Sequence, residues 1–290
     1  MRASAAVIVV AVAVAAAAPR AAQDPAVAAL LNKGNEYLTS YVQRASGASL
    51  DESYTLTEVT GGAMTVPVRI SSEIVFVNVN GRLHSMRDAT AIAGAKVKDA
   101  GGRLVPLLAN PTQAGWQQAQ QHAQEVYRYM GSELIVRMND PMLALHFVQP
   151  PVHGRFTYRI DGRKKLNGVD TTGLRFEETR GELTKYFMGT RGNGYLTGRL
   201  WTDPATGAVH ATEIWLESRT ETARSNVTYA FHKDLNLLLP SKTSENYDTR
   251  PAPEGMINRG EGGYGARQSF QVNATYANPK YTPVDLTKMR

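Results

Sequence analysis

Glu213 and Glu217 are the carboxylates whose spacing suggests chemistry, because alternate residues of an extended segment point to one side, here together with Trp215. Paired carboxylates catalyse glycoside hydrolysis when the two groups face each other across a cleft. Charges on the solvent face of an antiparallel strand are the more ordinary arrangement. Residues 208–218 therefore predict an outer strand face in preference to a catalytic pair.

Six histidines are scattered along the chain, and their spacings are not those of a standard metal site. His146 and His153, for example, are seven residues apart across Pro150-Pro151. A Ser–His–Asp site is defined by geometry and not by sequence order. A hydrolase with a site around His146 or His210 is therefore kept as a third hypothesis.

Motifs of common catalytic and nucleotide sites are missing from the sequence, which contains no His-Glu-x-x-His, no Gly-x-Ser-x-Gly and no P-loop. The chain has no cysteine, which excludes a thiol nucleophile and a disulfide. Residues 260–265 match Gly-x-Gly-x-x-Gly, but they lie in a Pro- and Gly-rich loop and not between a strand and its helix. We expect no enzymatic activity, no cofactor and no metal ion.

Several segments are predicted to be strands with one apolar and one polar face, and a binding site would have to be built on them. Residues 155–160, 172–177, 226–232 and 269–276 alternate in this way. A period of two with one buried and one wet face is typical of an antiparallel sheet.

Helices are predicted where an acid or amide precedes a proline. Asp24-Pro25 begins a helix that runs to Arg44, and Asn110-Pro111 begins another that runs to about Met130. Asp140-Pro141 begins a third, shorter helix over residues 142–147. An amphipathic helix must bury its apolar stripe, and the open face of the sheet is the large surface on offer. We therefore predict an α+β fold: a strongly curved antiparallel sheet, or half-barrel, with an N-terminal helix and two further helices covering its concave face.

The N-terminus has the pattern of a secretory signal. Met1-Arg2 precedes an uncharged run of Ala and Val over residues 5–18, which is shorter than the roughly 20 residues of a membrane-spanning helix. We expect a signal peptide at residues 1–22, a single domain at residues 23–290, no membrane-spanning segment, and export to the periplasm or the medium.

The charge of the chain is mild. Removal of Arg2 and Arg20 with the signal leaves 30 basic against 26 acidic residues, a net charge of +4. The basic run Arg163-Lys164-Lys165 follows Asp161-Gly162, where a solvated hairpin turn is predicted. Nucleic-acid binding needs many phosphate contacts, so we expect no nucleic-acid partner.

The concave apolar face is the candidate site. It is either a core filled by the side chains of the helices or a slot for an acyl chain, and the sequence leaves both open. The residues predicted to line an apolar cavity come from the strands and from the covering helices: Phe156, Tyr158, Phe176, Tyr229, Phe231, Trp116 and Phe147.

Two resemblances follow from short phrases of sequence. Residues 199–207, which end in Asp-Pro-Ala-Thr-Gly and precede a strand, resemble a hairpin of periplasmic outer-membrane lipoprotein-sorting carriers. That resemblance implies an unclosed β-barrel with a helical lid, which holds lipids or lipid-modified proteins in an apolar slot. Residues 86–89, 139–150 and 271–278 resemble an uncharacterised family of exported bacterial proteins, which implies no activity.

The leading hypothesis is therefore an exported, non-catalytic carrier or binding protein for an apolar ligand, a lipid or an acylated protein. The alternative is a structural or adaptor protein of the cell envelope with a packed core. Such a protein would bind an envelope protein through a sheet edge or through the loop at residues 250–265.

Overall fold

The computed structural model describes residues 24–60, 63–130, 135, 138–179, 194–218, 221–249 and 268–286. The predicted signal peptide and the loop at residues 250–265, with its Gly-x-Gly-x-x-Gly string, lie outside the described residues.

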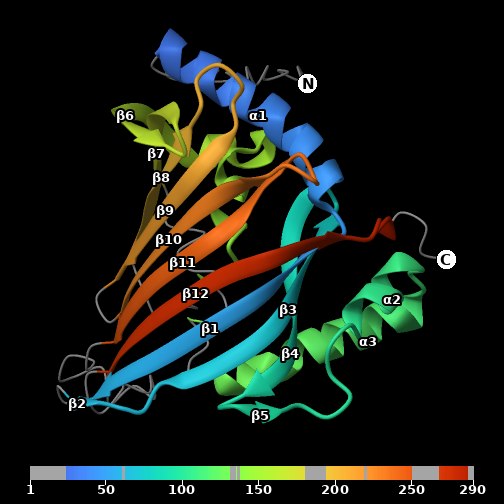
Figure 1. Cartoon of the computed structure of the whole chain (residues 1–290). Helices are drawn as coiled ribbons and strands as arrows, with labels where there is room; N and C mark the ends of the chain where they lie inside the picture. The colour runs from blue at the N-terminus through green and yellow to red at the C-terminus, as the bar shows by residue number, and fades with distance from the viewer. Residues whose placement is uncertain are drawn as a thin grey trace, which may run out of the picture.

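One antiparallel sheet of twelve strands forms the frame of the protein (Figure 1). The strand order is β5-β4-β3-β1-β12-β11-β10-β9-β8-β7-β6, and β2 pairs with β1. The end strands β5 and β6 are not paired with each other in the described chain, so the sheet is an unclosed half-barrel. The strands are β1 (Ala48–Thr60), β2 (Ala63–Met64), β3 (Val68–Val79), β4 (Arg82–Ile92), β5 (Ala95–Lys96), β6 (Phe156–Leu166), β7 (Val169–Glu178), β8 (Tyr195–Thr202), β9 (Val209–Glu217), β10 (Glu221–His232), β11 (Leu237–Thr249) and β12 (Gln268–Tyr281).

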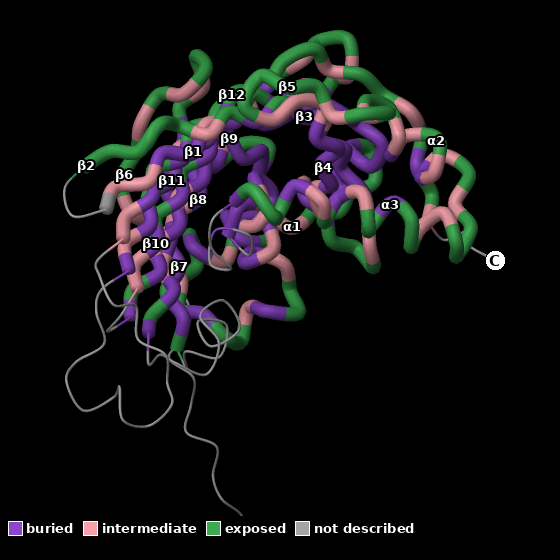
Figure 2. Tube along the Cα trace, turned by 90° about the horizontal axis from the view of Figure 1, so that it is seen from below, coloured by how far each residue is buried: buried purple, intermediate pink, exposed green. Residues whose placement is uncertain are grey.

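The sheet curves around one long helix and a segment of short 3-10 turns. The helical elements are α1 (Pro25–Ala45), α2 (Leu104–Ala109), α3 (Gln113–Glu125) and the 3-10 segments η1 (Val126–Tyr129), η2 (Leu143–Val148) and η3 (Pro150–Arg155). Figure 2 shows buried strands arching over α1 on the concave side. We call residues 138–155, which contain η2 and η3, the covering segment. Its apolar side chains share one hydrophobic cluster with α1 and with the inward faces of the strands.

The predicted helix starts are confirmed in two cases and shifted in one. Asp24 caps α1, because its Oδ1 accepts a hydrogen bond from the amide of Ala26 at 2.8 Å. Asp140 accepts from the amide of Met142 at 2.9 Å, but the following turns are 3-10 and not α-helical. The second helix begins at Gln113, and its cap is Thr112 instead of Asn110.

Helix α3 packs on the outer face of the sheet, which corrects the prediction that it covers the concave side. Ile74 and Phe76 belong to the concave cluster, whereas Val75 and Val77 form a second cluster with Ala119 and Ala123 of α3. The continuous apolar run at residues 74–77 had the pattern of a strand that is buried on both faces. A covered outer face follows from that run.

The predicted turn at Asp161-Gly162 is wrong. Strand β6 continues through these residues, and the pairing with β7 shifts register between Ile160 and Arg163. Gly162 has a φ of 86°, which permits such a bulge. The turn lies instead at Asn167-Gly168, where both residues have positive φ. The basic run at residues 163–165 therefore lies on an edge strand.

The Asp-Pro-Ala-Thr-Gly turn between β8 and β9 contacts α1. Lys33 of α1 donates through its Nζ to the carbonyl of Pro204 at 2.9 Å. Gly207 has a φ of 79°, and a Cβ on it would overlap the carbonyl oxygen of Lys33. The phrase that carried the family resemblance thus fixes α1 against the sheet.

Candidate functional site

Four of the predicted residues meet on the concave side and form an aromatic cluster. Phe147 of the covering segment has its ring centroid 5.4 Å from Phe156 and 5.3 Å from Phe176. Phe156 and Phe176 cross edge to face at 5.5 Å, and Tyr158 lies 6.1 Å from Phe156. The three phenylalanines are buried and Tyr158 is partly buried against the same core. The cluster is thus filled by its own side chains, with Phe147 as the ring that belongs to the covering segment.

The other three predicted residues are not in ring contact with these four in the described chain, and each has a different environment. Tyr229 is buried, and its hydroxyl donates to the carbonyl of Pro141 at 2.6 Å. Phe231 keeps the inward parity of Tyr229 but is 54% exposed, because it lies one residue from the end of β10. Trp116 is half-buried against the second cluster, on the outer face. Tyr229 shares the concave hydrophobic cluster with Phe156, whereas Trp116 packs against the cluster of the outer face and Phe231 is exposed.

The covering segment is held to the sheet mainly through its backbone carbonyls. Tyr158 donates to the carbonyl of Phe147 at 2.6 Å, and Tyr229 donates to that of Pro141. In the reverse direction, Nε2 of His146 lies 2.8 Å from the carbonyl of Leu83 in β4. Burial is the main cause that lowers the pKa of His146, so the ring is neutral and its Nε2–H donates this bond.

A buried polar cluster also lies on the inward face of the central strands. Arg87 of β4 donates to both carboxylate oxygens of Glu52 in β1, at 2.8 and 3.0 Å. The same guanidinium donates to the backbone carbonyl and the side-chain oxygen of Asn139, at 2.8 and 3.0 Å. Ser72 donates to Glu52 at 2.6 Å. Arg87 therefore joins the sheet to the start of the covering segment.

Glu245 is the second carboxylate of this region and is only 2% exposed. Burial raises its pKa to about 7, although hydrogen bonds from Tyr247 at 2.7 Å and Ser225 at 3.0 Å lower it. The charges of Arg87 and Glu52 also act on it, in opposite directions. Glu245 can therefore change its protonation state near neutral pH inside a closed core.

The sequence analysis missed this polar cluster, although strand parity contains the signal. Glu52 shares its parity with Leu50, Tyr54 and Leu56, all of which face the core. Glu245 likewise shares its parity with the buried Thr243 and Tyr247 of β11. A carboxylate at the inward parity of an otherwise apolar strand indicates a paired or functional charge, since an isolated buried charge is costly.

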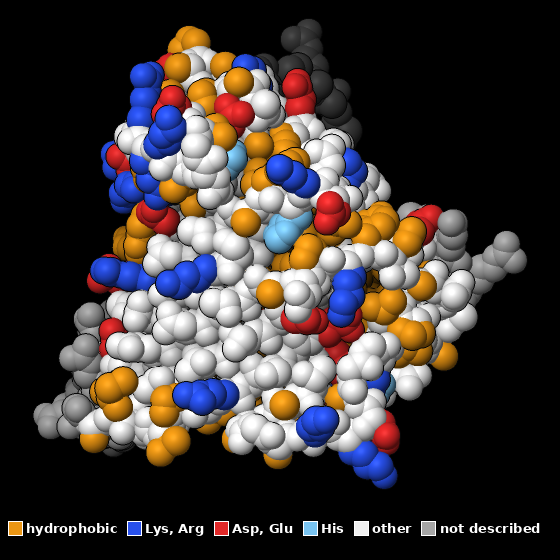
Figure 3. Space-filling model, viewed as in Figure 1, with side chains coloured by type: hydrophobic (Ala, Val, Ile, Leu, Met, Phe, Trp, Pro, Cys, Tyr) orange, Lys and Arg blue, Asp and Glu red, His pale blue; other side chains and the backbone are white. Residues whose placement is uncertain are grey.

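The outer face carries charged and aromatic side chains in ion pairs, as predicted for Glu213. Arg199 pairs with Glu213 at 3.4 Å and with Asp161 at 2.5 Å. Trp201 donates through its Nε1 to Glu213 at 2.7 Å. A groove of about 660 Å³ lies beside them, with Arg175, Arg199 and Arg224 around Trp215. Lys, Arg, Asp and Glu are intermixed on this face in Figure 3. Glu213 therefore has a structural role in this network.

The described histidines mostly contact backbone carbonyls, and the rings of His84 and His146 lie edge to face with centroids 5.3 Å apart. His146 is engaged with Leu83, and His153 contacts the carbonyl of Val148 at 2.6 Å. Burial lowers the pKa of His210, whose Nδ1 is buried without a hydrogen bond inside the described ranges. A group of three His, Asp or Glu side chains able to hold a metal is not found among the described residues.

Comparisons with solved structures find matches at low sequence identity and low TM-score. The search with family models and the search of curated proteins both give no match. A putative outer membrane lipoprotein-sorting protein domain from Vibrio parahaemolyticus is 13% identical over 89% of this chain and 96% of that chain, with a TM-score of 0.39. A DUF1329 family protein from Desulfovibrio piger is 10% identical over 87% and 92%, with a TM-score of 0.35. A LolA superfamily protein from Nitrosomonas europaea is 9% identical over 91% and 97%, with a TM-score of 0.31.

None of the described helices combines the length and the apolar character that crossing a membrane requires.

Proposed function

We propose that this protein is an exported, non-catalytic carrier that holds an apolar chain, a lipid or an acylated segment, between the sheet and the covering segment. The observation that supports this proposal is the place of Phe147, whose ring fills the space over Phe156 and Phe176. Phe147 sits in a 3-10 turn, a short and less regular form of helix. An acyl chain that displaces this turn would be buried against the same aromatic rings.

The structure is then the closed state of the carrier. In that state the covering segment and the ligand compete for one apolar surface, so binding costs the free energy needed to release the segment. The hydrogen bonds from Tyr158 to Phe147 and from Tyr229 to Pro141 stabilise the closed state. Each such bond typically contributes about 0.5–1.5 kcal/mol.

Saturable uptake of a fluorescent fatty acid tests the proposal. Tyr158→Phe and Tyr229→Phe each keep the ring and remove one bond to the covering segment. We expect each to increase the affinity about 2- to 10-fold, the factor that corresponds to one hydrogen bond. Tyr276→Phe is the matched control, because the hydrogen bond found for the Tyr276 hydroxyl among the described residues lies within the sheet, 3.0 Å from Oγ1 of Thr243.

Native mass spectrometry of the protein purified from its own envelope provides the second measurement. A bound species of lipid mass supports the carrier. A bare polypeptide mass, together with no fatty-acid uptake by the wild type and both tyrosine variants, contradicts it.

A structural or adaptor role is the second candidate function, and the packed concave side favours it. The aromatic cluster is a closed part of the core, so a partner would bind outside. The groove at Trp215, where the centres of the Arg175 and Arg199 guanidinium groups lie 5.8 and 5.7 Å from the ring, offers rigid aromatic and cationic side chains for that contact. Stoichiometric co-purification of an envelope protein that Trp215→Ala abolishes would favour this role.

A further inference from the structure

Three of the six histidines gather at the covering segment, close to Phe147. His146 directly precedes Phe147 in η2, and the ring of His84 in β4 lies against that of His146. On the other side of Phe147, Nε2 of His153 lies 2.6 Å from the carbonyl of Val148. Side chains that can gain a proton near neutral pH therefore surround the ring that covers the aromatic cluster.

The covering segment bridges the open side of the half-barrel. In the strand order, β4 lies near one end of the sheet and β6 forms the other end. On the β4 side, Nε2 of His146 donates to the carbonyl of Leu83 at 2.8 Å. On the β6 side, Tyr158 donates to the carbonyl of Phe147 at 2.6 Å. A change at His146 therefore acts on the attachment of the segment to β4.

The contact between the two imidazole rings suits neutral side chains. The rings of His84 and His146 cross edge to face, with centroids 5.3 Å apart and planes at 77°. Neutral aromatic rings favour this arrangement. Two positive rings at the same distance would repel each other. Because His84 belongs to the sheet and His146 to the covering segment, that repulsion would push the segment away from β4.

The surroundings of His146 disfavour its charged form while the segment is in place. Burial is the main cause that lowers the pKa of His146, and the charges of His84 and Arg82 act in the same direction. Asp140 and the hydrogen bond to Leu83 raise the pKa, but they do not outweigh the burial. Release of the segment returns the ring to water and its pKa toward the ordinary value of 6.5. The closed state therefore loses stability as the pH falls below 6.5.

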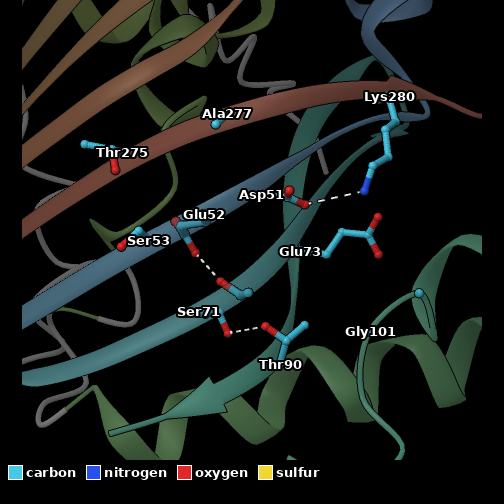
Figure 4. Close-up of a pocket in the computed structure, with 12 residues that line it drawn as sticks. Asp51, Glu52, Ser53, Ser71, Glu73, Thr90, Gly101, Thr275, Ala277 and Lys280 are labelled. Atoms are coloured by element: carbon cyan, nitrogen blue, oxygen red, sulfur yellow. Dashed lines mark hydrogen bonds and ion pairs between the residues drawn. The ribbon is translucent and has the colours of Figure 1, made fainter. Parts of the chain in front are cut away.

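The acidic side chains that Figure 4 shows on the outer face of β1 and β3 do not balance a charge on His84. Asp51 is paired with Lys280, whose Nζ lies 3.5 Å from its Oδ1. Glu73 lies four residues along β3 from Val77, the cross-strand partner of His84, which is a separation of about 13 Å. Exposed charges are largely screened beyond about 8 Å at physiological ionic strength.

We propose that mild acid opens the carrier, because protonation of His146 beside His84 releases the covering segment from β4 and uncovers the aromatic cluster. The proton comes from solvent and binds Nδ1 of His146, since Nε2 already carries the hydrogen that is donated to Leu83. The expected effect on ligand binding rests on the proposed carrier function, whereas the release of the segment does not.

Uptake of N-phenyl-1-naphthylamine at pH 7.5 and pH 5.5 tests the effect on binding, because this apolar fluorophore stays neutral at both values. His146→Gln keeps an N–H donor for Leu83 but cannot titrate. We expect the ratio of the affinity at pH 5.5 to that at pH 7.5 to be about tenfold larger in the wild type than in His146→Gln. His84→Gln removes the repelling ring and is expected to give an intermediate ratio. Glu245 titrates in all of these proteins, so its contribution cancels in the comparison.

Two controls separate this mechanism from a general loosening of the fold. Gln149→Ala removes a hydrogen bond from the covering segment to the carbonyl of Gly81, 2.9 Å long, that does not depend on pH in this range. It is expected to raise the affinity at both pH values and to keep the wild-type ratio. His122→Gln, on α3 of the outer face, is expected to change neither. A ratio that falls in both controls as it does in His146→Gln would overturn the proposal.

Hydrogen exchange of the backbone amides of η2 measures the release of the segment without a ligand. Comparing the wild type with His146→Gln at one pH cancels the intrinsic pH dependence of exchange. We expect equal protection at pH 7.5 and about tenfold faster exchange in the wild type at pH 5.5. Equal protection at both pH values would overturn the proposal. Faster exchange in acid without any uptake of the fluorophore would support the release and contradict the carrier function.

Discussion

Arg87 and Glu52 form a two-point ion pair inside the protein, with nitrogen–oxygen distances of 2.8 and 3.0 Å and side chains that are 4% and 0% exposed. The remaining donor capacity of Arg87 goes to Asn139, and Glu52 also accepts from Ser72. A buried pair is stable only when its other hydrogen-bonding positions are satisfied in this way. The pair therefore links the sheet to the covering segment at a fixed position.

Breaking this pair from one side is expected to be costly. Arg87→Met leaves the Glu52 carboxylate buried without its cation, and we expect the free energy of unfolding to fall by about 3–5 kcal/mol. Urea denaturation followed by circular dichroism measures this change. Arg69→Met, at an exposed position of β3, is the control and is expected to stay within about 0.5 kcal/mol of the wild type.

The double variant Glu52→Leu/Arg87→Met distinguishes the net contribution of the ion pair to stability from the penalty of leaving one buried charge unpaired. With both charges removed, we expect a stability closer to that of the wild type than that of Arg87→Met. A double variant less stable than Arg87→Met would contradict this account of the cluster.

Gly207 is expected to tolerate no side chain. Gly207→Ala combines a φ of 79° with an overlap between the new Cβ and the carbonyl of Lys33. We expect it to lower the free energy of unfolding by about 1–3 kcal/mol. Gly168→Ala is a useful comparison in thermal unfolding. Its φ of 81° is similar, but no atom lies within 4 Å of the added Cβ. Gly168→Ala is therefore destabilised only by the strain of a positive φ on a residue with a side chain.

The protonation of Glu245 is expected to appear as a pH dependence of stability. Its folded-state pKa, about 7, lies above the ordinary value of 4.5, so the folded chain binds this proton more tightly than the unfolded chain. The stabilisation is therefore complete below about pH 4.5 and is lost as the pH rises to about 7. The full loss amounts to about 3 kcal/mol.

Glu245→Gln, which cannot titrate, isolates that contribution. The free energy of unfolding of the wild type minus that of the variant, measured from pH 4.5 to 8, is expected to decrease as the pH rises. His146 acts in the opposite direction, because its lowered pKa reduces the stability of the folded protein as the pH falls through 6.5. Since His146 is present in both proteins, its contribution cancels in the difference. A difference that does not change with pH would contradict the raised pKa.

Local signals predicted the architecture well. The alternation in strands such as residues 269–276 and the Asp24-Pro25 start specify antiparallel strands and α1 because they act within a few residues. The position of α3 required knowledge of which face of β3 was still uncovered. That depends on Val75 and Val77, which alternate with core residues and whose partners lie about 40 residues away along the chain.

The candidate site was predicted less completely, for two physical reasons. Aromatic residues at inward parity are buried only where another element covers them, so Tyr229 is enclosed while Phe231, two residues later, is exposed. The polar cluster joins Glu52, Arg87 and Glu245 from three distant strands. The pairing of β4 with β3, β3 with β1, β1 with β12 and β12 with β11 brings these charges together.

Gly198 provides the space that the Phe176 ring occupies, which gives a direct test of the aromatic cluster. The two residues are cross-strand partners in β8 and β7, and a Cβ on Gly198 would overlap the Phe176 ring. Gly198→Ala is therefore expected to push this ring out of the cluster and to destabilise the protein by about 1–3 kcal/mol.

A smaller side chain at position 176 is expected to relieve that overlap. In a double-mutant cycle with Phe176→Leu, the two changes should cost less together than the sum of the single variants, by more than about 0.5 kcal/mol. The same Cβ would also overlap the backbone carbonyl of Glu213, a contact that Phe176→Leu leaves unchanged. Additive costs would therefore assign the requirement for glycine to the backbone of β9 and not to the aromatic cluster.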